Sequence, residues 1–311
     1  MYNRYKINLL IILCLLTIVL SACNQTRVKG VRERNKLTAE PEIVVVLNND
    51  QEKTMMFEDY ITGVVAGEMK SGWPENAYAA QAIIARTFAL KYMEENQTNT
   101  ISGSYQFAQE YTPENITPEL REAVKTTRGE AVVYEDDYIS AWFHSSAAGQ
   151  TTSAKVGLAY EKNEPPYIKS VRSPDDLAPV DVQNWTALFT SSRILEALSK
   201  MGKDIENLEK IEIVNRDDTG RVIDMKFFSD NNSVTVKAAE FRNQLDSKKL
   251  KSTKISEIKR SSNGYSFTGS GYGHGVGMSQ WGAYALAKEG KSPEEIINYY
   301  FKNTEIVKEY D

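Results

Sequence analysis

Apolar positions change their spacing several times along the first third of the chain. The run Ile43–Leu47 is β-branched and predicts a strand. Apolar residues at helical spacing predict a helix over Phe57–Met69, which Trp73-Pro74 would end, and a longer helix from Glu75 to about Glu95. Residues 97–117 are rich in Asn, Thr, Ser, Gly and Pro, a composition typical of loops. This part of the chain is therefore predicted as one strand followed by two helices.

The middle of the chain is predicted to consist mainly of strands. A short helix over Pro118–Thr127 ends at Gly129, which suits a C-cap. A hairpin follows around the turn Glu135-Asp136-Asp137, and a polar loop runs from His144 to Ala154. Further strands are predicted at Ile168–Val171, Trp185–Phe189, Ile211–Val214, Val222–Phe228 and Ser233–Val236.

Two helices are predicted near the C-terminus. The first begins near Met278 and stops before Gly290. The second opens with Ser292-Pro293-Glu294-Glu295, in which serine is the N-cap, proline takes the first helical position and the last glutamate completes a capping box. Helices and strands mix without βαβ alternation, so we expect an α+β fold over residues 42–311. It would form one compact domain, either undivided or with two lobes flanking a substrate groove.

The N-terminal residues have the pattern of a secretory leader. Arg4 and Lys6 precede the mostly apolar run Ile7–Leu20, and small residues lead from it to Cys23. This ending resembles the lipobox of bacterial lipoproteins, in which Cys23 would be acylated. The alternative is an uncleaved membrane anchor, although the apolar run is shorter than the roughly 20 residues that a span needs.

Both alternatives make residues 1–23 a signal or anchor and place the rest of the chain outside the cytoplasm at a membrane. Residues 24–41 are polar and without period, so they are predicted to be a flexible tether. The two cysteines, Cys14 and Cys23, both lie in the leader, so the folded part has no disulfide and no thiolate metal ligand. The formal net charge of -5 argues against a nucleic-acid partner.

The segment from Gly63 to Met69 carries the first candidate for chemistry. It places Glu68 at the end of an apolar helical stretch. Burial raises the pKa of a carboxyl, and a raised pKa is what a general acid needs at neutral pH. The alternative is an exposed glutamate near a helix end.

Two further segments carry polar side chains that could bind a ligand. His144–Thr152 is a loop of hydroxyl and small residues that could offer hydrogen bonds to a sugar or an anion; the alternative is a solvated loop. Adjacent residues on a strand point to opposite sides, so His144 and Ser145 are poorly placed as the base and nucleophile of a serine hydrolase. Gly269–Ala283 alternates glycine with other residues, which permits positive φ and close approach of the backbone to a bound group. It lacks the context of a dinucleotide or P-loop motif, and the alternative is a tight turn leading into a helix.

These segments together resemble the SpoIID/LytB family. The resemblance rests on Glu68-Met69 with Trp73-Pro74, the helix Ala80–Leu90, the His144-Ser145-Ser146 loop and Gly273–Ala283, in the family's order over roughly residues 42–305. It implies a lytic transglycosylase that cuts peptidoglycan strands freed of stem peptides, with Glu68 as the catalytic acid and no cofactor. It also implies work in engulfment during sporulation with an amidase, stage II sporulation protein P, and a membrane protein, stage II sporulation protein M.

The chain departs from the family's pattern at a few positions: Lys70-Ser71, Ala147-Ala148 and Thr152 replace residues that are commoner there. Some relatives bind zinc through cysteines near the histidine loop. This chain has none there, so no metal is expected.

In the mechanism expected from the resemblance, Glu68 protonates the oxygen between MurNAc and GlcNAc and then deprotonates the MurNAc 6-hydroxyl, which closes a 1,6-anhydro ring. Polar residues of the two loops would bind the sugars: His144, Ser145, Ser146, Tyr272, His274, Ser279 and Gln280. Arg86 would pair with Glu68 or with a lactyl carboxylate of the glycan, or else form a core-edge salt bridge.

Two other functions stay open from the sequence. One is a non-catalytic wall-binding module, since some relatives were described as amidase enhancers. The other is a hydrolase, in which a second carboxylate such as Glu58 or Glu75 would activate water. The product distinguishes the hydrolase, because it would carry a reducing MurNAc end.

Overall fold

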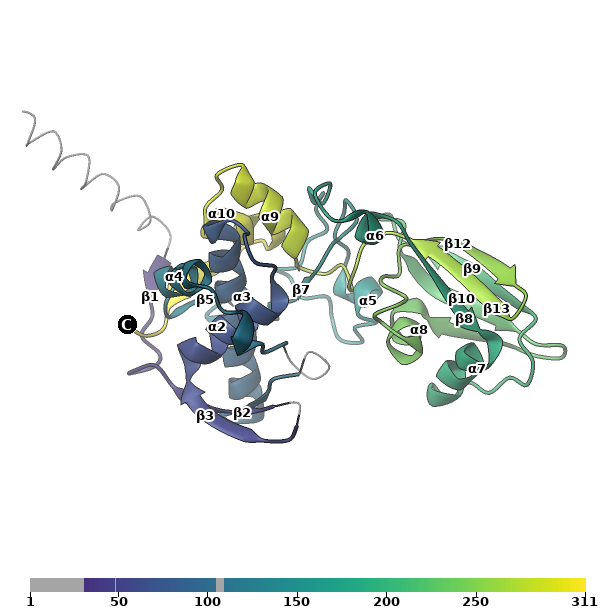
Figure 1. Cartoon of the computed structure of the whole chain (residues 1–311), viewed down its shortest axis with the longest axis horizontal. Helices are drawn as coiled ribbons and strands as arrows, with labels where there is room; N and C mark the ends of the chain where they lie inside the picture. The colour runs from purple at the N-terminus through teal and green to yellow at the C-terminus, as the bar shows by residue number, and fades with distance from the viewer. Residues whose placement is uncertain (1–30, 48, 105–108) are drawn as a thin grey trace, which may run out of the picture.

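The chain folds into two lobes that lie side by side along the long axis of the molecule (Figure 1). The computed structural model describes residues 31–47, 49–104 and 109–311, so the expected leader with Cys23 lies outside the described residues. One hydrophobic core spans residues 43–168 and 276–310 and defines the helical lobe; a second core, within residues 185–267, defines the sheet lobe. The sheet lobe is therefore an insertion between two parts of the helical lobe.

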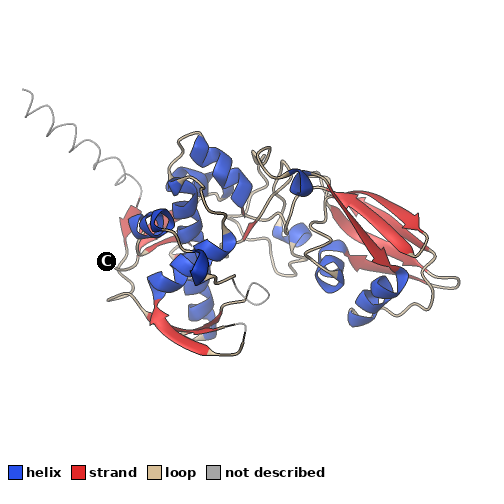
Figure 2. Cartoon of the chain, in the orientation of Figure 1, coloured by secondary structure: helices blue, strands red, loops and turns tan. Residues whose placement is uncertain are grey.

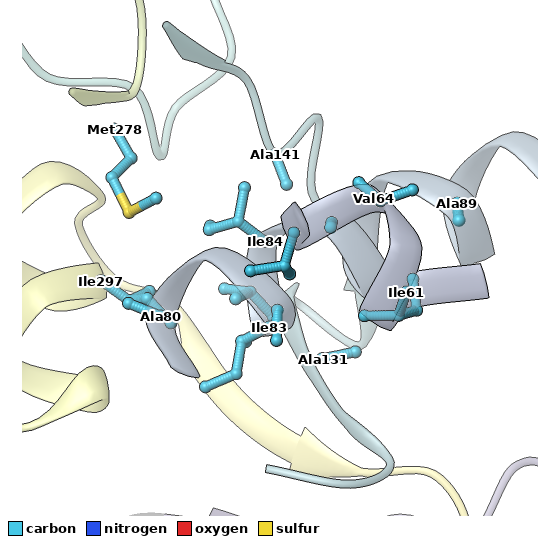
Figure 3. Close-up of a cluster of buried hydrophobic side chains, with 14 of the residues drawn as sticks. Ile61, Val64, Ala80, Ile83, Ile84, Ala89, Ala131, Ala141, Met278 and Ile297 are labelled. Atoms are coloured by element: carbon cyan, nitrogen blue, oxygen red, sulfur yellow. The ribbon is translucent and has the colours of Figure 1, made fainter. Parts of the chain in front are cut away.

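The helical lobe is built around the long helix α3. Its helices are α2 (Phe57–Glu68), α3 (Glu75–Asn96), α4 (Pro118–Thr126), α9 (Gln280–Lys288) and α10 (Pro293–Tyr300), with the short elements η1 (Pro113–Asn115) and α5 (Ala154–Gly157). Buried residues of α3 run almost without interruption from Ala77 to Leu90, because α2, α4, α9, α10 and β5 all contact it. Figure 3 shows this core, in which Ile61 of α2 and Ile83 of α3 lie among the apolar side chains.

In the part of the helical lobe that the structure describes, two small sheets and one short pair of strands accompany the helices. The first sheet has the order β1 (Val31–Glu33), β15 (Glu305–Lys308), β5 (Glu130–Tyr134) and β6 (Asp137–Tyr138). The second has the order β3 (Glu52–Met56), β2 (Glu42–Val46) and β4 (Thr100–Ser102). The parallel pair β7 (Phe143–His144) and β14 (Met278–Ser279) holds the start of the histidine loop beside the start of α9.

The sheet lobe contains two three-stranded antiparallel sheets, and Figure 2 shows the strands gathered there. The sheets have the orders β12 (Ile255–Ser261), β13 (Gly264–Gly269), β8 (Trp185–Thr190) and β11 (Ser233–Lys237), β10 (Val222–Phe228), β9 (Lys210–Arg216). The helices α7 (Ser191–Lys200) and α8 (Ala238–Leu245) belong to this lobe, and α6 (Val180–Gln183) precedes it. Burial alternates strictly along β8, so one face of its sheet covers the core and the other faces water.

The expected tether over residues 24–41 is corrected from Val31 onward, because this part is folded. Strand β1 runs parallel to β15. Arg34 forms a 3.3 Å ion pair with Glu309, whose side chain is fully buried. The charges that suggested a solvated tether are instead partners of charges on the folded lobe.

Mixed helices and strands confirm the predicted α+β class. The capping box of α10 is present as predicted, with Ser292 and Glu295 bonded reciprocally. The strand predicted at Ile168–Val171 is wrong, since Ile168 makes only an isolated bridge to Phe301. The sequence interpretation also missed α7, α8, β12 and β13. Among the described residues, no helix combines the length and the apolar character needed to cross a bilayer.

Candidate active site

Glu68 is the last residue of α2 and lies where three separate segments meet. Its Oε1 accepts a hydrogen bond from the backbone N–H of Glu110 at 3.0 Å. Its Oε2 accepts one from Nε2 of Gln280 at 3.4 Å. Glu110 belongs to the loop after β4 and Gln280 to the first turn of α9, so the carboxyl is fixed by residues far from it in sequence.

Two glycines of α2 make this arrangement possible. Gly63 and Gly67 are one turn apart and face the same loop. A Cβ at Gly67 would lie 2.4 Å from the carbonyl oxygen of Glu110, and a Cβ at Gly63 would lie 2.2 Å from the ring of Tyr111. Glycine thus lets the loop lie directly on the helix and brings the Glu110 N–H to the carboxyl of Glu68.

The pKa of the Glu68 carboxyl is raised to about 7. Its removal from water is the largest cause; the negative charge of Glu110 adds to it, whereas the hydrogen bonds from Glu110 N–H and Gln280 oppose it. The side chain is only half-buried, so it keeps access to solvent even though protein atoms crowd its carboxyl. At neutral pH a large fraction of Glu68 therefore carries the proton that a general acid donates.

The glycine run is packed tightly against other segments of the protein. Its four alternate glycines between residues 271 and 277 all have positive φ, from +71° to +105°. A Cβ on any of them would collide, at 2.1–2.9 Å, with Ser146, His144, Arg221 or Trp142. Positive φ and close approach are confirmed, but the group approached is the protein itself.

The two histidines, His144 and His274 of the glycine run, lie together with ring centroids 5.4 Å apart. His144 Nδ1 lies 3.1 Å from the carbonyl oxygen of Val276, so Nδ1 carries its proton. His274 Nδ1 accepts from the N–H of Val276 at 3.1 Å, so this ring carries its proton on Nε2. The ring also has a hydrogen bond with the Phe143 backbone. Burial comes first among the causes that lower the pKa of His274 to about 3 and that of His144 well below its usual value. Both rings are therefore neutral hydrogen-bonding supports.

The remaining residues of the histidine loop differ in their exposure. Ser146 is buried, and its backbone forms a bridge with that of Tyr272. Ser145 and Tyr272 are half-buried, and the carbonyl of Ser145 accepts from the N–H of Trp281 at 3.0 Å. Among the predicted sugar-binding residues of this loop and the glycine run, Ser145, Tyr272 and His274 keep exposed surface for a substrate, whereas His144 and Ser146 are buried.

Ser279 and Arg86 are buried, so the expectation that they contact substrate is corrected. The Ser279 hydroxyl donates to Oδ1 of Asp175 at 2.6 Å and caps α9. Arg86 is fully buried and binds the carboxylate of Glu58 through Nε and Nη2, at 2.9 and 2.8 Å. Of the alternatives that the sequence left open for Arg86, the structure has the salt bridge, and it is a core one.

The ion pair between Arg86 and Glu58 also bears on the hydrolase alternative, in which Glu58 was a candidate for the second carboxylate that activates water. Burial works against the charge of Glu58, but the attraction and hydrogen bonds of Arg86, with further bonds from Tyr310 and Gly129, leave its pKa below the usual value. Glu58 is thus a carboxylate anion whose oxygens are bound by Arg86 in the core. The carboxylate that influences Glu68 is Glu110, which nothing in the sequence pattern distinguished.

An aromatic cluster beside Glu68 was missed because its members were interpreted only as a helix breaker and part of a packed helix. The ring centroids of Trp73 and Trp281 are 4.7 Å apart, and Tyr284 lies 4.9 Å from Trp73. All three are half-buried. Lys70 Nζ lies 5.4 Å from the centroid of the Trp281 ring. Such rings can pack against the apolar faces of sugars, as they do against other flat surfaces.

The site thus combines one carboxyl that is largely protonated at neutral pH, an amide that touches it, neutral histidines and half-buried aromatic rings. This set suits proton transfer to a polar, ring-shaped substrate. Among the described residues, no three His, Cys, Asp or Glu side chains gather in a way that could hold a metal ion.

Comparison with known proteins divides the chain in the same way as its two cores. Residues 48–134 match the family described as Stage II sporulation protein (SpoIID). Residues 176–277 match a family described as a domain of unknown function, DUF8618, and cover the sheet lobe.

Similar whole proteins come from several bacteria. The chain is 30% identical to Stage II sporulation protein D of Bacillus subtilis over 275 residues, which are 83% of this chain and 76% of that protein. It is 31% identical to an uncharacterized protein of Brachyspira hyodysenteriae over 255 residues, 80% of this chain and 66% of that protein. It is 26% identical to the Amidase enhancer of Bacillus subtilis over 78% of this chain and 40% of that protein.

Proposed function

The chain belongs to the SpoIID family, and we propose that it is a peptidoglycan lytic transglycosylase with Glu68 as its single catalytic acid. The observation that carries the proposal is the carboxyl of Glu68, which is half-exposed and has a pKa of about 7. A carboxyl that is still largely protonated at neutral pH can donate to a glycosidic oxygen and then act as a base.

In the proposed reaction the Glu68 carboxyl gives its proton to the oxygen that links C1 of MurNAc to GlcNAc, and the C1–O bond breaks. The carboxylate formed then takes the proton of the MurNAc 6-hydroxyl while that oxygen bonds to C1. Glu68 regains its proton, and no water is consumed. Gln280, bonded to Oε2, would orient the carboxyl through both steps.

The proposal extends to the substrate and the setting. The substrate would be glycan strands whose stem peptides an amidase has removed, and the sugar contacts would come from Ser145, Tyr272 and His274. The protein would act outside the cytoplasm, held at the membrane by its N-terminal segment. In a sporulating cell, the amidase would be stage II sporulation protein P and the membrane partner stage II sporulation protein M.

Hydrolysis is a second candidate, and the observation that favours it is Glu110. Its charge acts on Glu68, and its side chain is exposed. A second carboxylate at the site could activate water and give a reducing end. Similarity to a protein named Amidase enhancer motivates a third candidate, a strand-binding module without cleavage.

One digestion experiment separates these functions. The full chain in detergent is incubated with peptide-free and peptide-bearing glycan strands, and the products are weighed by mass spectrometry. We expect 1,6-anhydro ends, which are lighter by one water than hydrolysis products, and their loss in Glu68→Gln. The exposed glutamate of η1 supplies the control Glu114→Gln, which should cleave normally. Reducing ends that vanish in Glu110→Gln would establish the hydrolase, and strand binding without cleavage would establish the binding module.

A further inference from the structure

Two lysine–aromatic pairs lie near the junction of the lobes. In the helical lobe, Lys70 Nζ lies 5.4 Å from the ring centroid of Trp281. In the second pair, Lys251 Nζ lies 5.7 Å from the ring centroid of Tyr272, a residue of the glycine run. Each pair presents a positive charge next to a flat apolar ring.

The carboxylate of Asp181 lies within the influence of both lysines. Lys251 Nζ is 2.9 Å from Asp181 Oδ2 and also donates to the carbonyl of Asp181 at 2.6 Å. The pKa of Asp181 is lowered, first by the hydrogen bond from Lys251 and its charge, with a smaller contribution from the charge of Lys70. Asp181 thus has Lys251 in direct contact and Lys70 near enough for its charge to act on the carboxylate, although the two lysines come from different lobes.

This region is continuous with the proposed catalytic centre. Lys70 follows Glu68 by two positions, and Trp281 follows Gln280, which touches Glu68. On the other side, Asp181 and Lys251 line an open hollow of ≈ 520 Å³ on the sheet lobe, together with Asn184, Trp185, Lys248 and Lys249. A strand that passes Glu68 would thus meet a series of cations on a protein whose formal net charge is -5.

The chemistry of the substrate supplies a matching group. When an amidase removes a stem peptide, it hydrolyses the amide on the lactyl group of MurNAc, so a neutral amide becomes a free carboxylate. A peptide-free strand therefore carries one such carboxylate in each disaccharide. A strand that keeps its peptides has none at these positions.

We propose that Lys70 and Lys251 form a subsite that selects peptide-free strands by binding their lactyl carboxylates, with the rings of Trp281 and Tyr272 beneath the neighbouring sugars. This inference rests on the proposed function and names the residues that would give that function its specificity. The side chain of Asp181 is 75% exposed, so it can rotate into water and yield its place on Lys251 to a carboxylate of the glycan. Asp181 then competes with the substrate.

The expected gain in affinity for the free acid can be estimated from the known strength of partly exposed charge pairs. Such a pair contributes up to about 1 kcal/mol, which corresponds to roughly a fivefold change in affinity. Salt screens these pairs, so the preference should weaken between about 0.05 and about 0.5 M NaCl.

The test uses two probes, a peptide-free GlcNAc–MurNAc tetrasaccharide and the same molecule with its lactyl carboxyls converted to methylamides. Cleavage kinetics of the full chain are compared with Lys70→Met and Lys251→Met. We expect the wild type to show a KM roughly fivefold lower for the free acid than for the amide. Each lysine variant should raise KM for the free acid only, with kcat kept. Asp181→Asn should lower it, which a merely structural role of Asp181 would not do.

The matched control is Lys226→Met, since Lys226 Nζ lies over the Phe228 ring at 5.0 Å on β10 of the sheet lobe. It should behave as the wild type on both probes. Equal KM values of the wild type for the two probes, or an equal loss on both probes in the lysine variants, would overturn the subsite while leaving the transglycosylase in place. Calorimetric binding of both probes to Glu68→Gln tests the subsite independently of cleavage. Tighter binding of the free acid than of the amide supports the subsite even if neither probe is cleaved.

Discussion

The Nε2 of Gln280 lies 3.4 Å from Oε2 of Glu68, although 212 positions separate the two residues in the chain. The sheet lobe is inserted between them, and both belong to the helical lobe. The contact joins the end of α2 to the start of α9. The site of the proposed acid is therefore assembled from two parts of the helical lobe that lie on either side of the sheet lobe in the sequence.

The proton on Glu68 should make activity depend on pH. With a pKa of about 7, the acid form declines as pH rises, so kcat/KM should fall about tenfold for each pH unit above 7. The measurement is the pH profile of strand cleavage between pH 5 and 9. A rate that stays flat up to pH 9 would contradict the assignment of Glu68 as the acid.

The same raised pKa makes a prediction for stability. The folded state binds more protons than the unfolded state between the ordinary pKa of 4.5 and about 7, so Glu68 lowers stability as pH rises through this window. Glu68→Gln removes this effect. We expect it to be more stable than the wild type at pH 8, by on the order of 1–2 kcal/mol after allowance for the partial exposure of Glu68, and similar at pH 4. Urea unfolding at both pH values measures it, with Glu114→Gln as the control.

Gly67→Ala should disturb the site through the backbone. In a free helix this change would stabilise by about 1 kcal/mol, but here the new Cβ meets the carbonyl of Glu110 at 2.4 Å. We expect a loss of at least about 1 kcal/mol and, because the Glu110 N–H moves off Glu68, a further upward shift of the pH profile. In Gly63→Ala the Cβ meets the Tyr111 ring instead, so stability should fall without that shift. Identical pH profiles for the wild type and Gly67→Ala would count against the argument.

Gly275→Ala should be costly because the glycine run presses on Arg221. A Cβ there would lie 2.4 Å from the guanidinium of Arg221, and φ is +81°. Strain and overpacking together should remove about 2–4 kcal/mol of stability. The control is Gly220→Ala, at a similar φ of +82° but with its nearest atom 3.9 Å away, which should lose only the part due to φ, about 1–2 kcal/mol. Chemical denaturation compares them, and equal losses would refute the contact argument.

Arg86→Met should destabilise the core and leave Glu58 as a buried, unpaired charge. The expected loss is about 3–5 kcal/mol, and Arg86→Met combined with Glu58→Gln should recover part of it. Because the pKa of Glu58 is lowered on folding, its contribution is present above the ordinary value of 4.5 and is lost as pH falls through the folded value. Unfolding between pH 2 and 7 should therefore show an acid-dependent loss in the wild type that is smaller in the double variant, which lacks the contribution of Glu58. Cleavage lost in the double variant despite restored stability would instead implicate Arg86 in the site.

The local sequence pattern predicted those helices and caps whose stability depends on residues close to them in the chain. The apolar spacing of α2 and α3 and the Ser292 capping box depend on contacts within a few residues, so they were recognisable. Strands β12 and β13 were not, because Ile255–Ser261 carries charge on its exposed face and only pairing across the sheet makes it a strand. Segment 31–41 looked like a tether for a similar reason: its partners, such as Glu309, lie at the other end of the chain.

The sequence by itself determined the family, the α+β class and two of the segments that meet at Glu68, the end of α2 and the glycine run that leads to Gln280, because these rest on residue types in a fixed order. Only the tertiary structure decided which of those polar residues face solvent. It buried Arg86 against Glu58, made Ser279 a helix cap and brought Glu110 and the aromatic rings to the site. Burial and pKa depend on atoms contributed by distant segments, and residue order alone does not specify which segments those are.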